Sequence, residues 1–200
     1  LKRVRPSQKD LNARLPSREQ FLELVATIRT GGGRFSKDAA AFVELLAYSG
    51  LRTGEAKWLR WKDCDLDGGV IIVRGDPTLG TKNGRIRRVP IISALQEFLT
   101  RQRVLAPKAS PSDFVCAVNE AQKSIDHAVA KLGIPRITHH DLRHLFATTC
   151  IESGVDIPTV SKWLGHTDGG VLAMKVYGHL RNEHSLTAAK LVSFSPADER

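Results

Sequence analysis

The stretch from Val70 to Ile91, VIIVRGDPTLGTKNGRIRRVPI, decides the fold class, because its composition is that of β-strands rather than helices. Val70-Ile71-Ile72-Val73 is a β-branched run, and residues 85–91 form a second strand-like run. Asn83-Gly84 between them predicts a two-residue hairpin turn with Lys82 at its mouth, since both central positions favour positive φ. The sequence therefore predicts a small antiparallel sheet of two or three strands.

Helical patterns lie on both sides of this stretch. Ser17 and Gln20 form a capping box that begins an amphipathic helix, a second helix ends at Ser49 before a left-handed Gly50, and a third begins near Thr53. Further helical segments are predicted at 93–105, 120–132, 139–153, 158–164, 170–178 and 183–192. The expected fold class is α+β, mostly α-helical with one small antiparallel β-sheet.

Composition narrows the class of partner. The 200 residues suffice for one domain, and the net charge of +9 with a pI near 9.8 favours a polyanion, most commonly nucleic acid. A ribosomal or heparin-like binder has the same charge signature. Cys64, Cys116 and Cys150 contain no CxxC, which predicts neither a disulfide framework nor a zinc site and favours a reducing compartment, the cytoplasm. No run of about 18 apolar residues predicts a membrane span.

Two features of the last third of the chain suggest chemistry on phosphorus. His140 and Arg143 are three residues apart on a predicted helix, so both can face one phosphate, the arginine through its fork and the histidine as a proton acceptor or donor. Tyr177 follows Gly169-Gly170, whereas Tyr48 has the helical spacing of a core residue. A phenol can attack phosphorus when nearby cations stabilise the charge that develops.

Each of these residues also has a simpler interpretation. The His140-x-x-Arg143 pair can be a solvated or core pair, and Tyr177 an ordinary surface tyrosine. His166, which follows Gly165, can bond only the last carbonyls of a helix. Lys82 can be a solvated turn lysine.

Taken in order, these residues resemble those of the tyrosine recombinases of the phage integrase family. The resemblance extends from about residue 17 to residue 185 and rests on several separate motifs. These are Ser49-Gly50-Leu51-Arg52-Thr53-Gly54-Glu55; Thr81-Lys82 with Arg88-Val89-Pro90-Ile91; His140-Asp141-Leu142-Arg143-His144; Leu164-Gly165-His166; and Tyr177-Gly178-His179.

The resemblance implies a role for each catalytic residue. Tyr177 would attack the scissile phosphate, forming a 3′-phosphotyrosyl bond and releasing a 5′-hydroxyl. Arg52 and Arg143 would clamp the non-bridging oxygens, and Lys82 would be the general acid for the leaving oxygen.

The histidines complete the implied site. His140 would assist proton transfer from Tyr177, and His166 would bond the phosphoryl group. Glu55 and His144 would orient these groups. No ATP, metal or other cofactor is needed, because the phosphotyrosine conserves the energy of the broken bond.

The resemblance also implies domains and partners. Residues 1–15 are expected to be a basic linker or arm, 16–192 the catalytic domain, and 193–200 a flexible C-terminal tail. The expected function is a site-specific DNA recombinase or integrase of a phage or mobile element, acting on double-stranded DNA through a tetrameric synapse, with accessory DNA-bending proteins as further partners. A type IB topoisomerase-like enzyme and a non-catalytic DNA-binding protein on the same fold are the alternatives.

Overall fold

The computed structural model describes residues 15–81 and 84–167, together with Val171 and Met174. Lys82, Asn83 and Tyr177 lie outside the described residues. So do the C-terminal tail, the basic arm except its last residue, and the helices expected at 170–178 and 183–192 except for Val171 and Met174.

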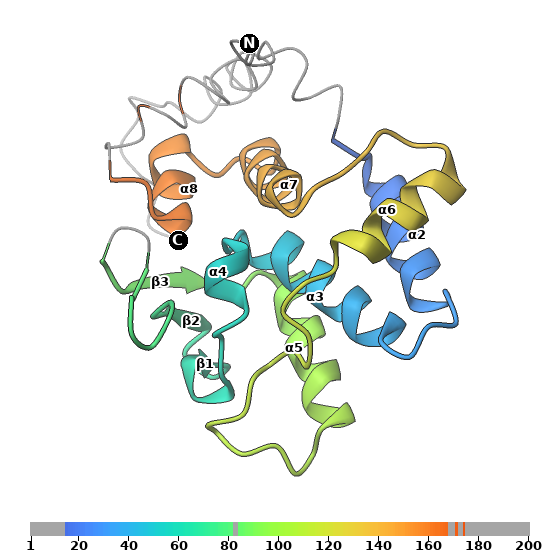
Figure 1. Ribbon diagram of the computed structural model, residues 1–200. Coiled ribbons are helices and arrows are strands. Elements are labelled where there is room, and N and C mark those ends of the chain that lie inside the picture. Colours follow the sequence, from blue (N-terminus) through green and yellow to red (C-terminus); the bar gives the residue numbers. More distant parts are fainter. Residues whose placement is uncertain (1–14, 82–83, 168–170, 172–173, 175–200) are drawn as a thin grey trace, which may run out of the picture.

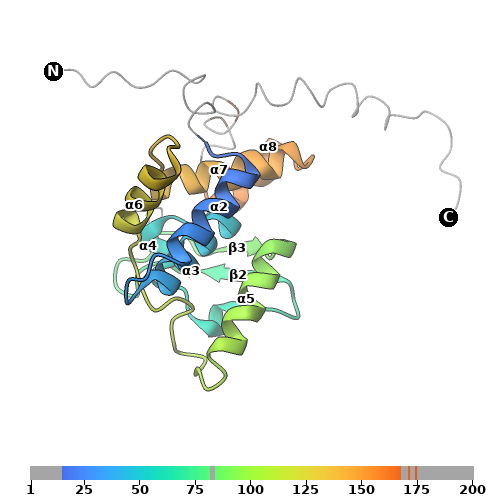
Figure 2. The same cartoon turned by 90° about the vertical axis from the view of Figure 1, so that its right-hand side faces the viewer.

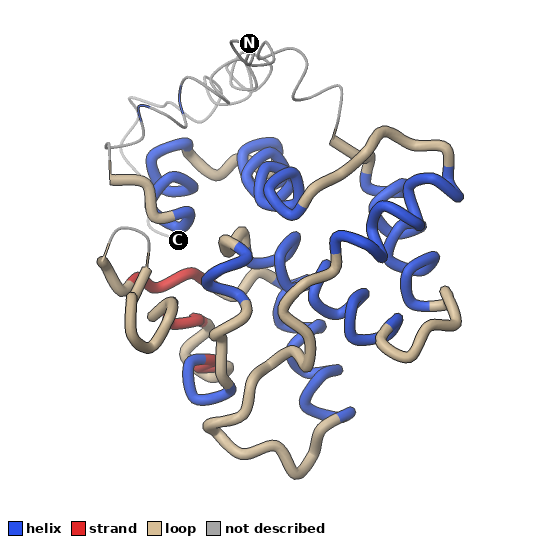
Figure 3. The backbone as a smooth tube through the Cα atoms, in the orientation of Figure 1, coloured by secondary structure: helices blue, strands red, loops and turns tan. Residues whose placement is uncertain are grey.

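The described part of the chain is mostly helical with one small sheet, which confirms the expected fold class (Figure 1, Figure 3). Its elements in chain order are α2 (Arg18–Arg29), α3 (Ser36–Ser49), α4 (Thr53–Ala56), the 3₁₀ helix η1 (Trp61–Asp63), β1 (Cys64–Asp65), β2 (Val70–Val73), β3 (Arg87–Pro90), α5 (Ser93–Leu105), α6 (Gln122–Leu132), α7 (His139–Glu152) and α8 (Ile157–Leu164).

Local signals in the sequence explain where the helices begin and end. The predicted capping box of Ser17 is present, since its hydroxyl accepts the backbone N–H of Gln20 and the Gln20 side chain accepts the Ser17 N–H. Gly50 ends α3 with a φ of 63°, as predicted. Another residue does not fit there, because a Cβ would lie 2.4 Å from the Phe146 ring.

The sheet has the order β1-β2-β3 with both pairs antiparallel, and Ile71 faces Val89 across the second pair. The prediction of a two-residue hairpin turn at Asn83-Gly84 is wrong. Strand β3 begins only at Arg87, which pairs with Val73, so residues 74–86 connect the strands.

This connection makes its own turns. It doubles back between Asp76 and Gly80, which exchange backbone hydrogen bonds of 2.9 and 2.7 Å, while the Asp76 carboxylate accepts the N–H groups of Thr78 and Leu79. The connection therefore reverses first at Asp76–Gly80, before the Asn83-Gly84 position that the sequence predicted for the turn. Its second turn, described below, carries Lys82.

Two clusters of buried side chains hold the fold together. The larger surrounds α3 and includes residues of α2, α5, α6 and the sheet. The smaller lies between α7 and α8 and includes Phe146, Val160 and Leu164. Ile92 and Trp163 pack against both clusters. Helices α7 and α8 thus lie on one side of α3 and α4, with the sheet and α5 on the other (Figures 1 and 2).

The three cysteines are free thiols at the edges of these clusters. Cys64 and Cys116 pack against the larger cluster, and Cys150 belongs to the smaller one. Burial raises the pKa of Cys64 to about 12 and that of Cys150 to about 11, and it also raises the pKa of Cys116. No helix within the described ranges has the length and apolar character needed to cross a bilayer.

Candidate active site

Arg52 lies in the turn between α3 and α4, where a buried carboxylate orients it. Its backbone N–H donates to Oε2 of Glu55 at 2.9 Å, and its Nη1 donates to Oε1 at 3.1 Å. Glu55 therefore caps the first turn of α4 and holds the guanidinium at the same time. The Arg52 side chain remains 28% exposed, so an anion can reach it.

Arg143 on α7 is 4% exposed and joins two turns that are distant in the sequence. Its Nη1 donates to the carbonyl of Gly50 at 2.6 Å, and its Nη2 donates to the carbonyl of Leu164 at 2.5 Å. Gly50 comes two residues before Arg52, and Leu164 comes two residues before His166. Arg143 thus fixes the two turns that carry these side chains relative to each other.

His140 and His144 lie on α7 together with Arg143. His140 is exposed and its ring lies 4.5 Å from that of His144, at nearly a right angle. Burial is the main cause that lowers the pKa of His144 to about 4, and the nearby charges of His140, Arg143 and His166 lower it further. His144 is therefore neutral at pH 7. His166, at the end of α8, is therefore close enough to His144 to act on its pKa.

A cavity of about 330 Å³ opens between α8, the start of α4 and the connection before β3. Ser161 lines it, and its buried hydroxyl has no hydrogen-bond partner in the described part of the chain. No Asp or Glu among the described residues lines it. The basic side chains that line it are Arg52, Arg85, Arg87, Lys162 and His166. Such a lining suits a phosphate or another anion.

Arg87 is a site residue that sequence reasoning missed. It donates Nη1 and Nη2 to the two carboxylate oxygens of Glu55, both at 2.8 Å, and Nε to the carbonyl of Trp163 at 2.8 Å. Strand alternation could have found it, because Arg87 lies two residues before the buried Val89 and so faces the same side of the sheet.

The charge state of Glu55 follows from these contacts. Burial alone would raise the pKa of its carboxyl, but the hydrogen bonds and charge of Arg87, followed by those of Arg52, hold the pKa at about 2. The carboxylate is therefore charged throughout the physiological range and keeps both guanidiniums in place.

A second hollow, of about 540 Å³, adjoins the first and shares Thr81, Arg85 and Ile86 with it. It is basic and aromatic in character. Asp63 is paired with Arg74 at 2.8 Å, and the Asp76 carboxylate is used within its own turn. Its other lining side chains include Trp58, Arg60, Lys62 and Arg85.

The structure brings part of the predicted site together. Arg52 and His166 line one cavity, Arg143 ties together the turns that carry them, and His140 lies beside His144 on α7. Lys82 and Tyr177 lie outside the described residues. The chain around Lys82 is described, however: Gly84 N–H donates to the Thr81 carbonyl at 2.8 Å, and the Thr81 hydroxyl bonds both the N–H and the carbonyl of Arg85 at 2.9 Å.

Curated proteins that are similar to this chain include two that are named tyrosine recombinases. The tyrosine recombinase XerC of Xanthomonas campestris pv. campestris (strain B100) is 33% identical over 152 residues, which cover 72% of this chain and 45% of XerC. The tyrosine recombinase XerA of Saccharolobus solfataricus is 30% identical over 159 residues, 77% of this chain and 52% of XerA. The chain thus spans about half the length of the curated relatives it matches.

Solved structures show the same fold. The catalytic domain of bacteriophage HP1 integrase superposes with a TM-score of 0.65 at 21% identity, over 92% of this chain and 98% of that domain. The Tn1549 transposon integrase in complex with a circular intermediate DNA gives 0.67 at 17% identity, over 96% of this chain and 68% of that one. The profile of the phage integrase family matches residues 17–184. The chain therefore belongs to the phage integrase family.

Proposed function

We propose that this chain, with residues 16–192 as its catalytic domain, belongs to a site-specific DNA recombinase that cleaves and rejoins DNA through a 3′-phosphotyrosyl intermediate. The observation that carries the proposal is the basic cavity that Arg52 and His166 line, with Arg143 joining the two turns behind it. Family membership supports the same conclusion. A site of this kind stabilises phosphoryl oxygens with guanidinium and imidazole groups, so no metal enters the proposal.

In the proposed reaction Arg52 and Arg143 hold the non-bridging oxygens of the scissile phosphate. The Tyr177 oxygen bonds to phosphorus while the bond from phosphorus to the 5′-oxygen breaks. The Tyr177 proton passes to His140, and Lys82 gives a proton to the leaving 5′-oxygen. His166 bonds a phosphoryl oxygen from the end of α8. Attack by a second 5′-hydroxyl reverses these steps and rejoins the strand.

Double-stranded DNA is the proposed substrate. The two adjoining basic hollows supply cations on both sides of the Thr81–Arg85 turn, as a phosphodiester backbone passing this turn requires. The Tn1549 transposon integrase, which shares this fold, forms a complex with a circular intermediate DNA. Recombination joins two duplexes, so we propose self-assembly into a tetrameric synapse, with accessory DNA-bending proteins. Three free thiols fit a reducing compartment, for which we propose the cytoplasm.

Trapping on a suicide DNA substrate tests the proposal. The Tyr177→Phe variant should bind DNA with unchanged affinity and form no covalent adduct, because only the attacking oxygen is removed. The matched control is Tyr48→Phe, since Tyr48 packs at 5.8 Å against Phe21 in the core. An adduct that persists in Tyr177→Phe and disappears in Tyr48→Phe would contradict the assignment.

A further inference from the structure

The carboxyl end of α8 is held by two arginines from other elements. A helix leaves its last four carbonyls without partners inside the helix. Here the Ser161 and Lys162 carbonyls accept the N–H groups of the turn that follows, at 3.1 and 3.0 Å. The Trp163 carbonyl accepts Nε of Arg87 at 2.8 Å, and the Leu164 carbonyl accepts Nη2 of Arg143 at 2.5 Å. The turn that carries His166 therefore depends on side chains outside α8.

Arg87 also binds the carboxylate that orients Arg52. Its guanidinium donates to both oxygens of Glu55, whereas Arg52 donates one side-chain N–H to Glu55. The Arg87 side chain is 11% exposed, which is less than the 28% of Arg52. Arg87 thus joins the α4 turn to the end of α8 through three hydrogen bonds of a single guanidinium.

The place of Arg87 in the chain adds a third connection. It is the first residue of β3 and is separated by Ile86 alone from the Thr81–Arg85 turn, whose sequence includes Lys82. The Thr81 hydroxyl closes the base of that turn. Whatever fixes Arg87 therefore fixes the carboxyl-terminal arm of the turn as well.

We propose that Arg87 is a positioning residue that fixes the turn of Lys82 relative to Arg52 and His166. This inference rests on the proposed function, because it assigns Lys82 to proton donation in that reaction. Arg87 does not replace the phosphate clamp; it acts by holding Glu55 and the end of α8 against the start of β3.

Gly165 shows how closely Arg87 fits. A Cβ at position 165 would lie 3.0–3.1 Å from Cδ, Nε and Nη1 of Arg87, and the φ of 71° already favours glycine. Arg88 provides the contrast, because it is exposed on the other face of the same strand. Removal of Arg88 thus changes the net charge by the same amount without touching Glu55 or α8.

The first experiment measures adduct formation by this chain at saturating DNA, on a normal suicide substrate and on one with a 5′-bridging sulfur. A sulfur leaving group does not need a proton donor. Arg87→Ala should form the adduct about 100-fold more slowly on the normal substrate, because a misplacement of reacting groups by about 1 Å lowers the rate by about that factor. The substrate with the 5′-bridging sulfur should raise the rate of Arg87→Ala by about 10-fold or more. It should do the same for Lys82→Ala but not for Arg52→Ala. Arg88→Ala should behave as the unsubstituted chain.

The second experiment uses hydrogen–deuterium exchange without DNA, so it holds whether or not the chain cleaves. Arg87→Ala should speed exchange at the N–H groups of Gly84, Arg85 and His166 by about 10-fold or more, and Arg88→Ala should not. Arg87→Lys keeps the positive charge beside Glu55 and should preserve the fold. It should show the same pattern at smaller amplitude, because lysine lacks the bidentate guanidinium group.

Two results would overturn the inference. One is unchanged exchange at these N–H groups in both Arg87 variants. The other is a slow Arg87→Ala that sulfur does not rescue, which would limit Arg87 to supporting Arg52. If the unsubstituted chain forms no Tyr177 adduct, the proposed function fails, and the exchange measurement still decides whether Arg87 positions the turn.

Discussion

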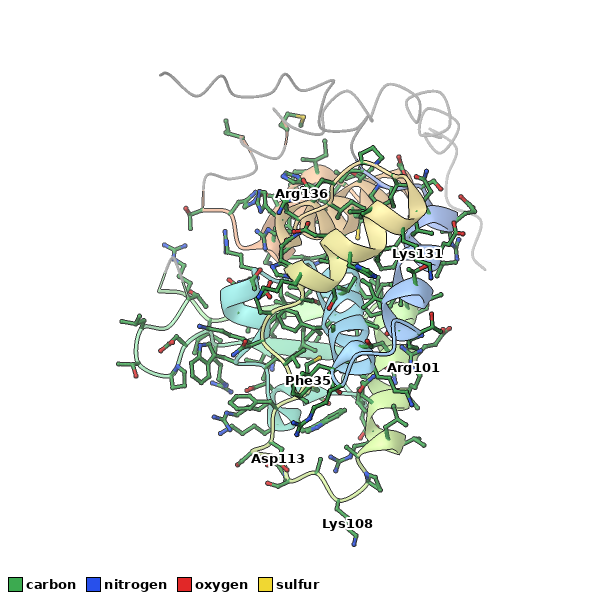
Figure 4. The ribbon with its side chains drawn as sticks, turned by 45° about the vertical axis from the view of Figure 1, so that its right-hand side comes forward. Phe35, Arg101, Lys108, Asp113, Lys131 and Arg136 are labelled. Carbon is green, nitrogen blue, oxygen red and sulfur yellow. The ribbon has the colours of Figure 1, made fainter. Side chains whose placement is uncertain are left out.

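Two buried glutamates, Glu44 and Glu55, each bind two arginines, yet they lie in regions with different tasks. Glu44 is on α3, and a single oxygen, Oε2, accepts Arg29 of α2 at 2.6 Å and Arg101 of α5 at 2.8 Å. Those two arginines are 39% and 45% exposed, and Arg101 lies along α5 in Figure 4. At Glu55 both oxygens are used, and both arginines line a cavity.

The difference shows that the role of a buried glutamate depends on whether its arginines face solvent or a cavity that can hold a ligand. The arginines of Glu44 end in solvent and join three helices of the large cluster. Those of Glu55 are more buried and adjoin His166. Substitutions at the two clusters should therefore separate stability from cleavage.

The largest expected effect is on cleavage by Arg52→Ala. Loss of one donor to developing phosphoryl charge costs about 100- to 1,000-fold in rate. Arg52→Lys should rescue little, because a point charge cannot copy the fork. Arg29→Ala is the matched control and should cleave normally. Equal loss of cleavage by Arg52→Ala and Arg29→Ala in single-turnover trapping would contradict the difference between the Glu55 and Glu44 clusters.

Glutamine at each buried glutamate should sharpen the contrast. Glu55→Gln leaves Arg87 buried without its carboxylate and should lower the free energy of unfolding by about 3 kcal/mol and slow cleavage. Glu44→Gln frees arginines that already reach solvent, so it should cost about 1 kcal/mol and leave cleavage unchanged. Urea denaturation and adduct trapping measure the two effects. Equal destabilisation would show that exposure of the arginines does not matter.

Acidification should lower the stability of the active-site region in two successive pH windows that overlap slightly. The folded pKa of His144, about 4, lies below its ordinary 6.5, so the unfolded chain takes the proton first. Stability should fall between pH 6.5 and 4, by about 3 kcal/mol at most. Glu55, whose pKa falls from 4.5 to about 2, adds a loss only below pH 4.5.

Denaturation midpoints measured from pH 8 to pH 3 test these windows. His144→Gln should flatten the slope between pH 6.5 and 4 while leaving the one below pH 4.5. Burial also lowers the pKa of His139, so a reduced slope should remain, and a slope unchanged from that of the unsubstituted chain would contradict the assignment to His144.

The smallest effect is expected at Arg101. Arg101→Ala should cost no more than about 1 kcal/mol, because Arg29 still binds the same oxygen and the lost pair is half exposed. The double variant Arg29→Ala/Arg101→Ala should cost more than the sum of the two single variants, since Glu44 is then buried alone. Additive losses in thermal denaturation would argue against a shared carboxylate.

Local chemistry makes much of the fold predictable. The capping box of Ser17 and the left-handed Gly50 are set by neighbouring residues, so sequence patterns find both. The predicted two-residue β2–β3 turn is wrong because Val73 pairs with Arg87, which leaves residues 74–86 as the connection. That register depends on the packing of the whole sheet.

The candidate site is predictable where motifs are short and hidden where contacts are long-range. Arg52 and Glu55 are three residues apart, so their pairing follows from helix geometry. Arg87 meets Glu55 across 32 residues and Trp163 across 76, which no local pattern encodes. The buried position of Arg143 between two carbonyls likewise comes from tertiary packing.

The burial of the three thiols makes the chain suitable for selective chemical labelling. With the pKa of Cys150 near 11 and that of Cys64 near 12, very little thiolate exists at neutral pH, and maleimides react with thiolate. Lys108 projects from the loop after α5, at the bottom of Figure 4. A fluorophore attached through Lys108→Cys would therefore report on the proposed DNA binding and assembly from one known position, with the native cysteines left in place.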